Sequence, residues 1–297
     1  RFEMATNGCF DAAKCRFVGN NIDYVVISFD GPAAVHDHHR PLRNGAGSYD
    51  LVSRNAMALS GSKTNLSIRV CMTQASAGRF VRDAEWLCRT FRPAALNVEP
   101  LRPTPQSARA GLMPPTPWEF ARAVHGASRV STSFGIPVIY ASALIDRVRS
   151  AFCPVGRDVP IVCPDGGVYA CYLQERDWID VGLDLRLGHV LPKDGQLHLD
   201  RSAIDRVRKV AEIPAACYSC FCRWHCAGGC RVSLHGTQRK EGPEDFCIQT
   251  RILCACGLLD RLGRPDLSDR LMADNEALEK MIFRKSDEIT KWEDDES

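Results

Sequence analysis

Residues 217–230 have the sequence Cys-Tyr-Ser-Cys-Phe-Cys-Arg-Trp-His-Cys-Ala-Gly-Gly-Cys, and the interpretation of the whole chain starts from them. Four of these cysteines follow one another as C-x2-C-x5-C-x3-C, namely Cys217, Cys220, Cys226 and Cys230. Thiolates at such short and irregular spacing suit soft metals or iron–sulfur clusters. The two glycines before Cys230 allow the backbone to pass close to a sulfide and to donate N–H groups to it.

Three more cysteines flank this segment: Cys153 and Cys171 precede it, and Cys247 follows it. Buried structural thiols explain four patterned cysteines within fourteen residues poorly, although cysteine is often buried. A disulfide framework is typical of small secreted proteins, whereas this chain spreads 15 cysteines over 297 residues. Zinc stays a serious alternative, because four-cysteine sites of related spacing bind it.

The bulk composition is that of an ordinary globular protein, with 45% hydrophobic and 25% charged residues. A net charge of +2, with Arg and Lys scattered along the chain, gives no electrostatic case for nucleic-acid binding. No apolar run approaches the roughly 18 residues that a membrane span needs. We therefore expect neither nucleic acid nor membrane as a partner, and a cytoplasmic location, because reduced thiols suit that compartment.

Residues 1–150 alternate short apolar runs with helical patterns, which predicts parallel βα units. Asp11 and Ser48 are expected to cap helices, and the continuous run Tyr24–Phe29 is expected to be a strand buried on both faces. Ligands of such folds bind at the carboxyl ends of the strands. The expected strands are 2–5, 24–29, 66–72, 95–101 and 136–140, and the expected helices are 11–18, 49–59, 79–91, 117–130 and 141–152.

From Cys153 the sequence changes character, since Pro, Gly and Cys dominate as far as Cys247. Residues 161–163 and 168–170 flank Pro164–Gly167, which predicts a tight hairpin. Such a segment needs covalent or metal crosslinks to supplement a thin core. Helical spacing returns at 273–289, and the acidic end, 293–296, is expected to be a solvated tail. The expected domains are 1–150, 151–250 and 251–297.

In order and spacing, these cysteines resemble the SPASM domain of radical S-adenosylmethionine (radical SAM) enzymes. The matching pattern is C-x12-G-x4-C from Cys153 to Cys171, then the 217–230 segment, then Cys247. The first half agrees independently. Several of its short segments resemble the peptide and protein maturases of that family. They are Val26–Pro32, His36-Asp37, Arg40 and Gly47–Asp50, together with Thr6–Gly8 and Asn97–Pro100. The resemblance covers roughly residues 2–250.

The resemblance implies an α/β fold: a partial (βα) TIM-like barrel followed by a small Cys-rich SPASM domain and C-terminal helices. It also implies two auxiliary [4Fe-4S] clusters. One would be held by Cys217, Cys220, Cys226 and Cys247. The other would be held by Cys153, Cys171 and Cys230, with Cys163 either its fourth ligand or a buried strand thiol. The remaining cysteines are expected not to be ligands: Cys9, Cys15, Cys71, Cys88, Cys222, Cys254 and Cys256.

One motif of the family is absent. The C-x3-C-x2-C that holds the cluster binding S-adenosylmethionine does not occur in residues 1–150. We therefore expect this chain to be the C-terminal portion of a longer enzyme, unable to cleave S-adenosylmethionine alone; the third [4Fe-4S] cluster and that cofactor would belong to the intact enzyme. Ser28 resembles a position that contacts the methionine part of the cofactor, and Thr6 and Asn7 lie near the same rim, although all three also suit plain turns.

The family implies an oxidoreductase that modifies a ribosomally made peptide or protein by hydrogen-atom abstraction, with a reductant such as flavodoxin or ferredoxin. The auxiliary clusters would aid electron transfer or substrate binding. Tyr172 stands where sulfatase-maturing relatives have an Asp, which argues against formylglycine formation; Glu175, Asp177 and His225 are candidate bases. Asp37 and Arg40 are expected either to form an ion pair that fixes their loop or to contact the cofactor. The alternative is a non-catalytic zinc- or cluster-binding module that recognises peptides, or a purely structural scaffold.

Overall fold

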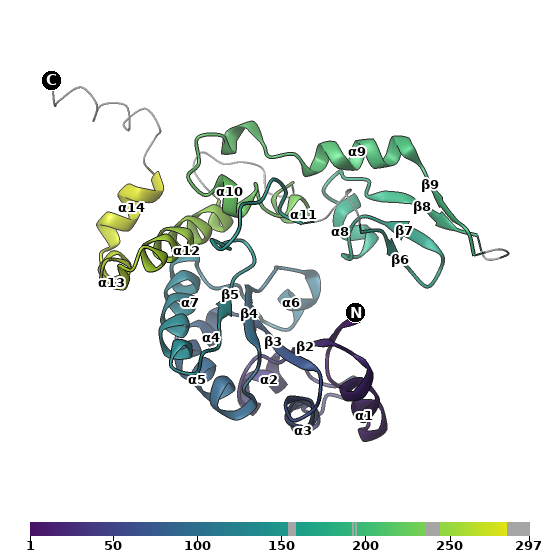
Figure 1. Ribbon diagram of the computed structural model, residues 1–297, viewed down its shortest axis with the longest axis horizontal. Coiled ribbons are helices and arrows are strands. Elements are labelled where there is room, and N and C mark those ends of the chain that lie inside the picture. Colours follow the sequence, from purple (N-terminus) through teal and green to yellow (C-terminus); the bar gives the residue numbers. More distant parts are fainter. Residues whose placement is uncertain (154–158, 192, 194, 236–243, 284–297) are drawn as a thin grey trace. The chain divides into compact units, whose positions relative to one another are not determined.

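The computed structural model describes residues 1–153, 159–191, 193, 195–235 and 244–283 (Figure 1). The chain divides into two compact units. The first unit comprises residues 1–143 and 245–278, so it includes a segment that lies after the cysteine-rich part in sequence. The second unit comprises the described residues of 144–244 and the short piece 279–283.

The first unit is built on a five-stranded parallel sheet whose strands follow one another in sequence order. This confirms the predicted α/β class, and among the described residues the sheet does not close into a barrel. The strands are β1 (Glu3–Thr6), β2 (Tyr24–Ser28), β3 (Asn65–Met72), β4 (Ala95–Pro100) and β5 (Val138–Ile139).

Helices alternate with these strands, and local sequence signals explain where several of them begin. The Asp11 side chain caps α1 by accepting a hydrogen bond from the Lys14 N–H, as predicted. Thr116 and Glu119 form a capping box at the start of α7. The helices of this unit are α1 (Ala12–Asn21), α2 (Ala33–His39), α3 (Tyr49–Ser60), α4 (Gln74–Ala77), α5 (Phe80–Phe91), α6 (Pro105–Arg109), α7 (Pro117–Thr132), α12 (Asp245–Arg261) and α13 (Pro265–Ala273), and α14 (Asn275–Phe283) begins in it.

Ser48 precedes α3 as predicted, but it does not cap that helix. Its hydroxyl instead donates a hydrogen bond to the carbonyl oxygen of Arg40 at 2.6 Å. The predicted side-chain cap is therefore wrong, because Ser48 has near-helical backbone angles (φ −102°, ψ −9°) instead of the extended ones of a capping residue, and its hydroxyl bonds to the preceding loop.

The two faces of the sheet differ in burial. In β2, Val25 and Ile27 are fully buried, whereas Tyr24, Val26 and Ser28 are half-buried. In β3, the residues from Leu66 to Met72 alternate in the same way. The prediction that β2 is buried on both faces is therefore wrong, because helices such as α3 cover only one face of the sheet and the other carries polar side chains.

The predicted helix over 141–152 is also wrong, because these residues form turns and bends. The N–H of Ala143 closes a turn onto the Tyr140 carbonyl at 3.0 Å. In the second unit, the N–H of Arg149 donates to the Trp224 carbonyl at 2.8 Å, and its guanidinium Nε donates to the His225 carbonyl at 2.7 Å. These partners, distant in sequence, replace the bonds that a helix would make. The Pro-rich loop before Pro117 contains α6, which the sequence pattern did not predict.

The second unit contains a four-stranded antiparallel sheet in the order β6-β7-β8-β9. Its first two strands form the predicted hairpin, closed by the Cys163 N–H donating to the Gly167 carbonyl at 2.9 Å. The strands are β6 (Ile161–Val162), β7 (Gly167–Tyr169), β8 (Arg186–Val190) and β9 (Leu197–Leu199). The helices are α8 (Glu175–Ile179), α9 (Arg201–Ala211), the 3-10 helix η1 (Ala215–Cys217), α10 (Arg223–Cys226) and α11 (Arg231–His235).

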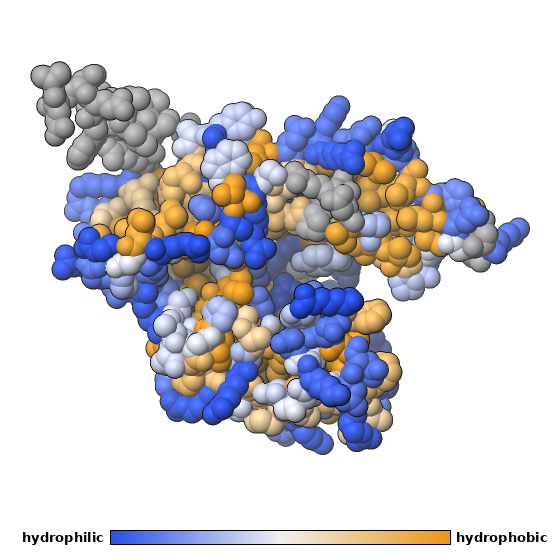
Figure 2. Space-filling model, viewed as in Figure 1, coloured by the Kyte–Doolittle hydropathy of each residue, from blue (hydrophilic) through white to orange (hydrophobic). Residues whose placement is uncertain are grey.

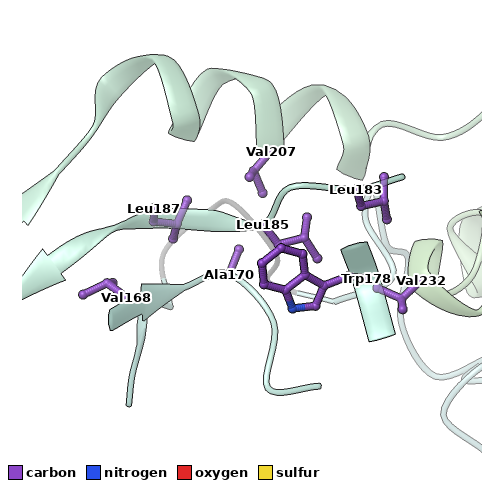
Figure 3. Packing of buried hydrophobic residues seen from close by; sticks show 8 residues of the cluster. All are labelled: Val168, Ala170, Trp178, Leu183, Leu185, Leu187, Val207 and Val232. Carbon is purple, nitrogen blue, oxygen red and sulfur yellow. The ribbon is translucent and has the colours of Figure 1, made fainter. Parts of the chain in front are cut away.

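The core of this unit is small. Trp178 is fully buried at its centre, and Figure 3 shows Val207 pointing from α9 toward the sheet. The other members are Val168, Ala170, Leu183, Leu185, Leu187 and Val232. Figure 2 shows that apolar residues also gather on the surface of this sheet, where Val162, Leu197 and Leu199 are exposed. So few buried side chains agree with the expected need for crosslinks.

Two sequence expectations lie partly or wholly outside the described residues. The predicted final helix over 273–289 corresponds to α14, whose described part ends at Phe283. The predicted acidic tail, 293–296, lies outside the described residues. Among the helices that the structure describes, none is both long and apolar enough to cross a membrane.

Candidate functional site

The candidate site is the polar face of the parallel sheet near the carboxyl ends of its strands. The sheet register places Ser28 of β2 beside Arg69 of β3, and Arg69 beside Asn97 of β4. One step further toward the strand ends, Cys71 lies beside Glu99. Because side chains alternate between the faces of a strand, these residues share the face that the helices leave uncovered. The face thus combines a hydroxyl, a cation, an amide, a thiol and a carboxyl group.

Asp30, just after β2, is the buried charge that organises this end of the sheet. Its carboxylate accepts hydrogen bonds from Arg40 Nε at 2.7 Å and Nη2 at 3.1 Å, and from the Cys71 N–H at 2.9 Å. His39 Nδ1 lies 3.3 Å from the same group. Burial raises the pKa of Asp30, but the hydrogen bonds from His39 and Arg40 outweigh burial and lower this pKa to about 2. Asp30 is therefore ionised and holds the site rather than exchanging protons.

The partner of Arg40 differs from the expected one. Arg40 pairs with Asp30, not with Asp37. Asp37 instead accepts a hydrogen bond from the Tyr49 N–H at 2.7 Å. The expected ion pair is wrong because Asp30, at the strand end, is the carboxylate that the guanidinium reaches. Asp30 was not among the predicted site residues; a charged side chain soon after a buried strand was the available signal.

His36 is completely buried next to Asp30. Its Nδ1 accepts the Asp30 N–H at 3.3 Å, and its ring lies 4.6 Å from that of Phe29 between centroids. Burial lowers the pKa of His36 to about 4, so the ring is neutral at pH 7. Its Nε2 has no hydrogen-bond partner among the described residues.

Glu99 is the group on this face that can exchange a proton near neutral pH. Burial raises its pKa to about 7, although the nearby charge of Arg69 and the Ala141 N–H, at 3.4 Å, oppose the rise. Burial and the charge of Asp30 raise the pKa of the neighbouring Cys71 thiol to about 11. Cys71 is therefore a neutral thiol at pH 7.

Ser28 is half-buried at its strand end and makes no side-chain hydrogen bond within the described part of the chain. The guanidinium of its neighbour Arg69 likewise has no hydrogen-bond partner there, and Arg69 is exposed. These two groups, adjacent across the sheet, are therefore available to a ligand. Sequence reasoning found Ser28 but missed Arg69, because its spacing along the chain does not reveal the register.

Thr6 and Asn7 have local partners. Thr6 Oγ1 accepts a hydrogen bond from the Gly8 N–H at 3.1 Å, and Asn7 Oδ1 accepts one from the Cys9 N–H at 3.0 Å. These bonds are typical of turns formed by such residues. They account for Thr6 and Asn7 without a ligand, while the predicted role in cofactor binding stays untested.

The cysteine segment of the second unit folds as a chain of tight turns. The N–H of Cys220 donates to the Cys217 carbonyl at 3.0 Å, and that of Cys226 donates to the Cys222 carbonyl at 2.8 Å. Ala227, Gly228 and Gly229 then have φ values of 49°, 77° and 73°. Three consecutive residues with positive φ turn the chain sharply, and two of them are glycines, which adopt such angles without strain.

The predicted ligands are distributed over both units. Cys171 and Cys230 both pack against the Trp178 core. Cys153, Cys163, Cys217 and Cys220 are half-buried, Cys226 is buried, and Cys247 belongs to α12 of the first unit. Among the described residues, no group of three or more His, Cys, Asp or Glu side chains is placed to hold a metal ion. Both ligand sets therefore stay predictions. Of the seven cysteines expected not to be ligands, five are buried: Cys15, Cys88, Cys222, Cys254 and Cys256.

The candidate bases of the second unit differ in their surroundings. Glu175 forms an ion pair with Arg186 at 3.3 Å, and Asp177 accepts the Gln174 N–H at 3.1 Å, so both have structural roles. His225 lies directly before Cys226, and its Nδ1 is buried without a hydrogen-bond partner among the described residues. A buried nitrogen without a hydrogen-bond partner, in a segment rich in cysteine, suits a segment that binds a metal or cluster.

Comparison with known proteins shows which fold this is. The chain is similar to anSMEcpe, an anaerobic sulfatase-maturating enzyme of the radical SAM/SPASM type. A structure of the native enzyme with bound AdoMet gives a TM-score of 0.63 at 18% identity, covering 90% of this chain and 74% of that one. A structure with AdoMet and the Kp18Cys peptide gives a TM-score of 0.60 at 18% identity, covering 90% and 75%. No protein-family model matches the chain, and no curated protein is significantly similar to it. The α/β fold with its five-stranded parallel sheet is therefore similar to that of a radical SAM enzyme.

Proposed function

We propose that this chain is part of a radical SAM/SPASM maturase, an oxidoreductase that modifies a ribosomally made peptide or protein by hydrogen-atom abstraction. The observation that carries the proposal is the coincidence of two independent features. The fold is similar to that of anSMEcpe, and the cysteines stand in the order of a SPASM domain. The anSMEcpe structures contain AdoMet and, in two cases, a peptide. We propose the same classes of cofactor and substrate here.

The polar face of the sheet is the proposed cofactor surface. S-adenosylmethionine carries a carboxylate and an ammonium group on its methionine part. The unpartnered guanidinium of Arg69 suits the carboxylate, and the hydroxyl of Ser28 can accept or donate beside it. When bound, S-adenosylmethionine and a reduced iron–sulfur cluster supply an oxidising radical. Of the residues of this chain, Arg69 and Ser28 would orient the cofactor, and Glu99, with a pKa of about 7, would take up or release a proton at its carboxylate.

The chain lacks one component of that chemistry. None of its 297 residues form C-x3-C-x2-C. We propose that the ligands of the reducing cluster lie outside these residues and that the chain alone does not cleave S-adenosylmethionine. The test is to incubate the reconstituted chain with S-adenosylmethionine and a flavodoxin or ferredoxin reductant. Release of 5′-deoxyadenosine above a no-protein control would refute this part of the proposal.

The cysteines are proposed to hold two auxiliary [4Fe-4S] clusters for electron transfer or substrate binding. Cys217, Cys220, Cys226 and Cys247 would hold one, and Cys153, Cys171, Cys230 and Cys163 the other. Two observations support a metal-bearing segment: the consecutive left-handed residues before Cys230 and the orphaned His225 nitrogen. The alternative is a zinc- or cluster-binding module that recognises peptides without catalysis.

Metal analysis separates these functions. The chain is purified and reconstituted without oxygen, and iron, sulfide and zinc are counted. Two clusters correspond to about eight irons with matching sulfide. Cys220→Ala should lose about half of that iron, whereas Cys222→Ala, two residues away and expected not to be a ligand, should keep all of it. Zinc without sulfide in the wild type, or equal iron in both variants, would contradict the assigned clusters.

A further inference from the structure

Two histidines of the second unit face each other across the hairpin of β8 and β9. His189 and His198 are directly opposite in the antiparallel register. Their rings are stacked, with centroids 5.5 Å apart and an angle of 12° between the ring planes. Both residues are exposed. Directly opposite side chains of neighbouring strands lie on the same face of a sheet, so both imidazoles project to the same side.

The backbone on either side fixes this pairing. The Leu191 N–H donates to the Gln196 carbonyl at 3.0 Å, and the Asp200 N–H donates to the Leu187 carbonyl at 2.8 Å. Gly188 has a φ of 156°, and a Cβ there would overlap the carbonyl oxygen of His198. Only glycine therefore allows β9 to approach β8 this closely. The backbone contacts of β8 with β9 therefore set the register that joins the two histidines.

The spacing suits metal chelation. Imidazole is the commonest metal-binding side chain of proteins, and two imidazoles bound to one tetrahedral metal, with metal–nitrogen distances of about 2.0 Å, have centroids about 5 Å apart. The stacked pair is already near that separation, so the rings need only turn about χ2, an angle with broad freedom in histidine. We propose that His189 and His198 form a two-ligand site for a late first-row divalent cation such as Zn²⁺, Ni²⁺ or Cu²⁺.

The metal would crosslink β8 to β9, and water or an outside ligand would complete its coordination. Among the described residues, no third His, Cys, Asp or Glu side chain joins the pair. The site is independent of the cysteines and of the proposed maturase function. This histidine site affects how the zinc count in the metal analysis above is interpreted. About one zinc per chain would come from this pair, so such a count in the wild type alone does not identify a zinc–cysteine module.

Retention of the tag-free full chain on immobilised Ni²⁺ tests the site. His189→Phe and His198→Phe each keep a ring for stacking but remove the ligand nitrogen. Each single variant should elute at a clearly lower imidazole concentration than the wild type, and the double variant should elute with the single ones, because chelation needs both nitrogens. His38→Phe removes another exposed histidine and should elute with the wild type. The proposal would be overturned if His189→Phe or His198→Phe eluted with the wild type. It would also be overturned if the decreases in eluting imidazole concentration of the two single variants added up in the double variant.

A second measurement distinguishes this site from cysteine binding. Zn²⁺ is titrated into the chain labelled with ¹⁵N-histidine, and the resonances of His189 and His198 are assigned from the two variants. Both resonances should shift together at the same zinc concentration in the wild type. In His189→Phe, the His198 resonance should require at least about tenfold more zinc. Zinc taken up without a shift of these resonances would be bound elsewhere, and the proposal would fail.

Discussion

The carboxylate of Asp30, just after β2, accepts a hydrogen bond from the N–H of Cys71 in β3 at 2.9 Å. This bond joins the carboxyl ends of two neighbouring strands across the sheet. Arg40 supplies the opposite charge at 2.7 Å. The side chain of Asp30 is 1% exposed and that of Arg40 is 31% exposed. This ion pair, in which Asp30 is buried and Arg40 is half-buried, thus links the strand ends that carry the candidate cofactor surface.

We predict that Asp30→Asn destabilises the fold by about 3 kcal/mol, because it leaves Arg40 half-buried without its partner. Urea unfolding followed by circular dichroism measures the change. The matched control is Glu85→Gln, which breaks the exposed Glu85–Arg89 pair within α5 and should cost about 0.5 kcal/mol or less. Equal losses in the two variants would contradict the role given to Asp30.

The raised pKa of Glu99 predicts a pH effect on stability. Its pKa is about 7 in the folded chain, against an ordinary value of 4.5. The folded state therefore holds this proton more tightly, and the resulting stability is present below pH 4.5 and lost as pH rises to about 7. Glu99→Gln should lack this loss. The free energy of unfolding of both proteins, measured from pH 4.5 to 8, gives the comparison, and parallel curves would count against a raised pKa.

The buried His36 predicts an effect of opposite sign. Its pKa is about 4 in the folded chain, against 6.5 ordinarily. The unfolded chain thus binds the proton first, and stability is lost as pH falls from 6.5 to about 4, with a slope of up to about 1.4 kcal/mol per pH unit. His36→Asn keeps an acceptor for the Asp30 N–H but removes the titration. In the Glu99→Gln background, where the opposing effect is gone, adding His36→Asn should flatten the curve; an unchanged slope would exclude His36 as its source.

The C-terminal helices of the first unit depend on Arg129 of α7. Its guanidinium donates to Asp260 of α12 at 2.7 Å and to Asp269 of α13 at 2.8 Å. Arg129→Met keeps much of the aliphatic stem but removes both bonds, together with those to the Pro265 carbonyl and the Ser268 hydroxyl, and should cost about 1 kcal/mol because the guanidinium is partly solvated. Hydrogen exchange should rise in α13 and stay unchanged in β2 and β3. Uniform change across the unit would instead indicate global destabilisation.

The turn before Cys230 requires glycine at position 228. Its φ is 77°, and a Cβ there would lie 2.7 Å from Pro214 Cδ and from the Arg231 guanidinium. Gly228→Ala should therefore reduce stability by more than the roughly 1–2 kcal/mol of left-handed strain and should lower metal content. Gly182→Ala is the control, since Gly182 has a φ of 76° with no atom within 4 Å of a Cβ. Equal losses of stability and metal in both variants would contradict the close packing at Gly228.

Much of the secondary structure was predictable because it depends on neighbours in the chain. Asp11 caps α1 through an amide three residues away, and the turn at Pro164–Gly167 depends on its own residues. The prediction failed over 141–152, where the amide and guanidinium of Arg149 bond to carbonyls more than seventy residues away. No local pattern records such partners.

The chemical character of the chain was also present in its sequence, because cysteine spacing and short motifs are linear properties. That pattern indicated a radical SAM/SPASM resemblance, and the structural similarity to anSMEcpe agrees with it at the level of the fold. Which residues meet was decided by the tertiary structure. The sheet register brings Ser28 beside Arg69 and Cys71 beside Glu99, and the β8–β9 register brings His189 beside His198. For the parallel strands, register arises from packing and backbone hydrogen bonds between segments distant in sequence, and for the β8–β9 hairpin it also depends on the connection between the two strands; the residue types at single positions specify neither.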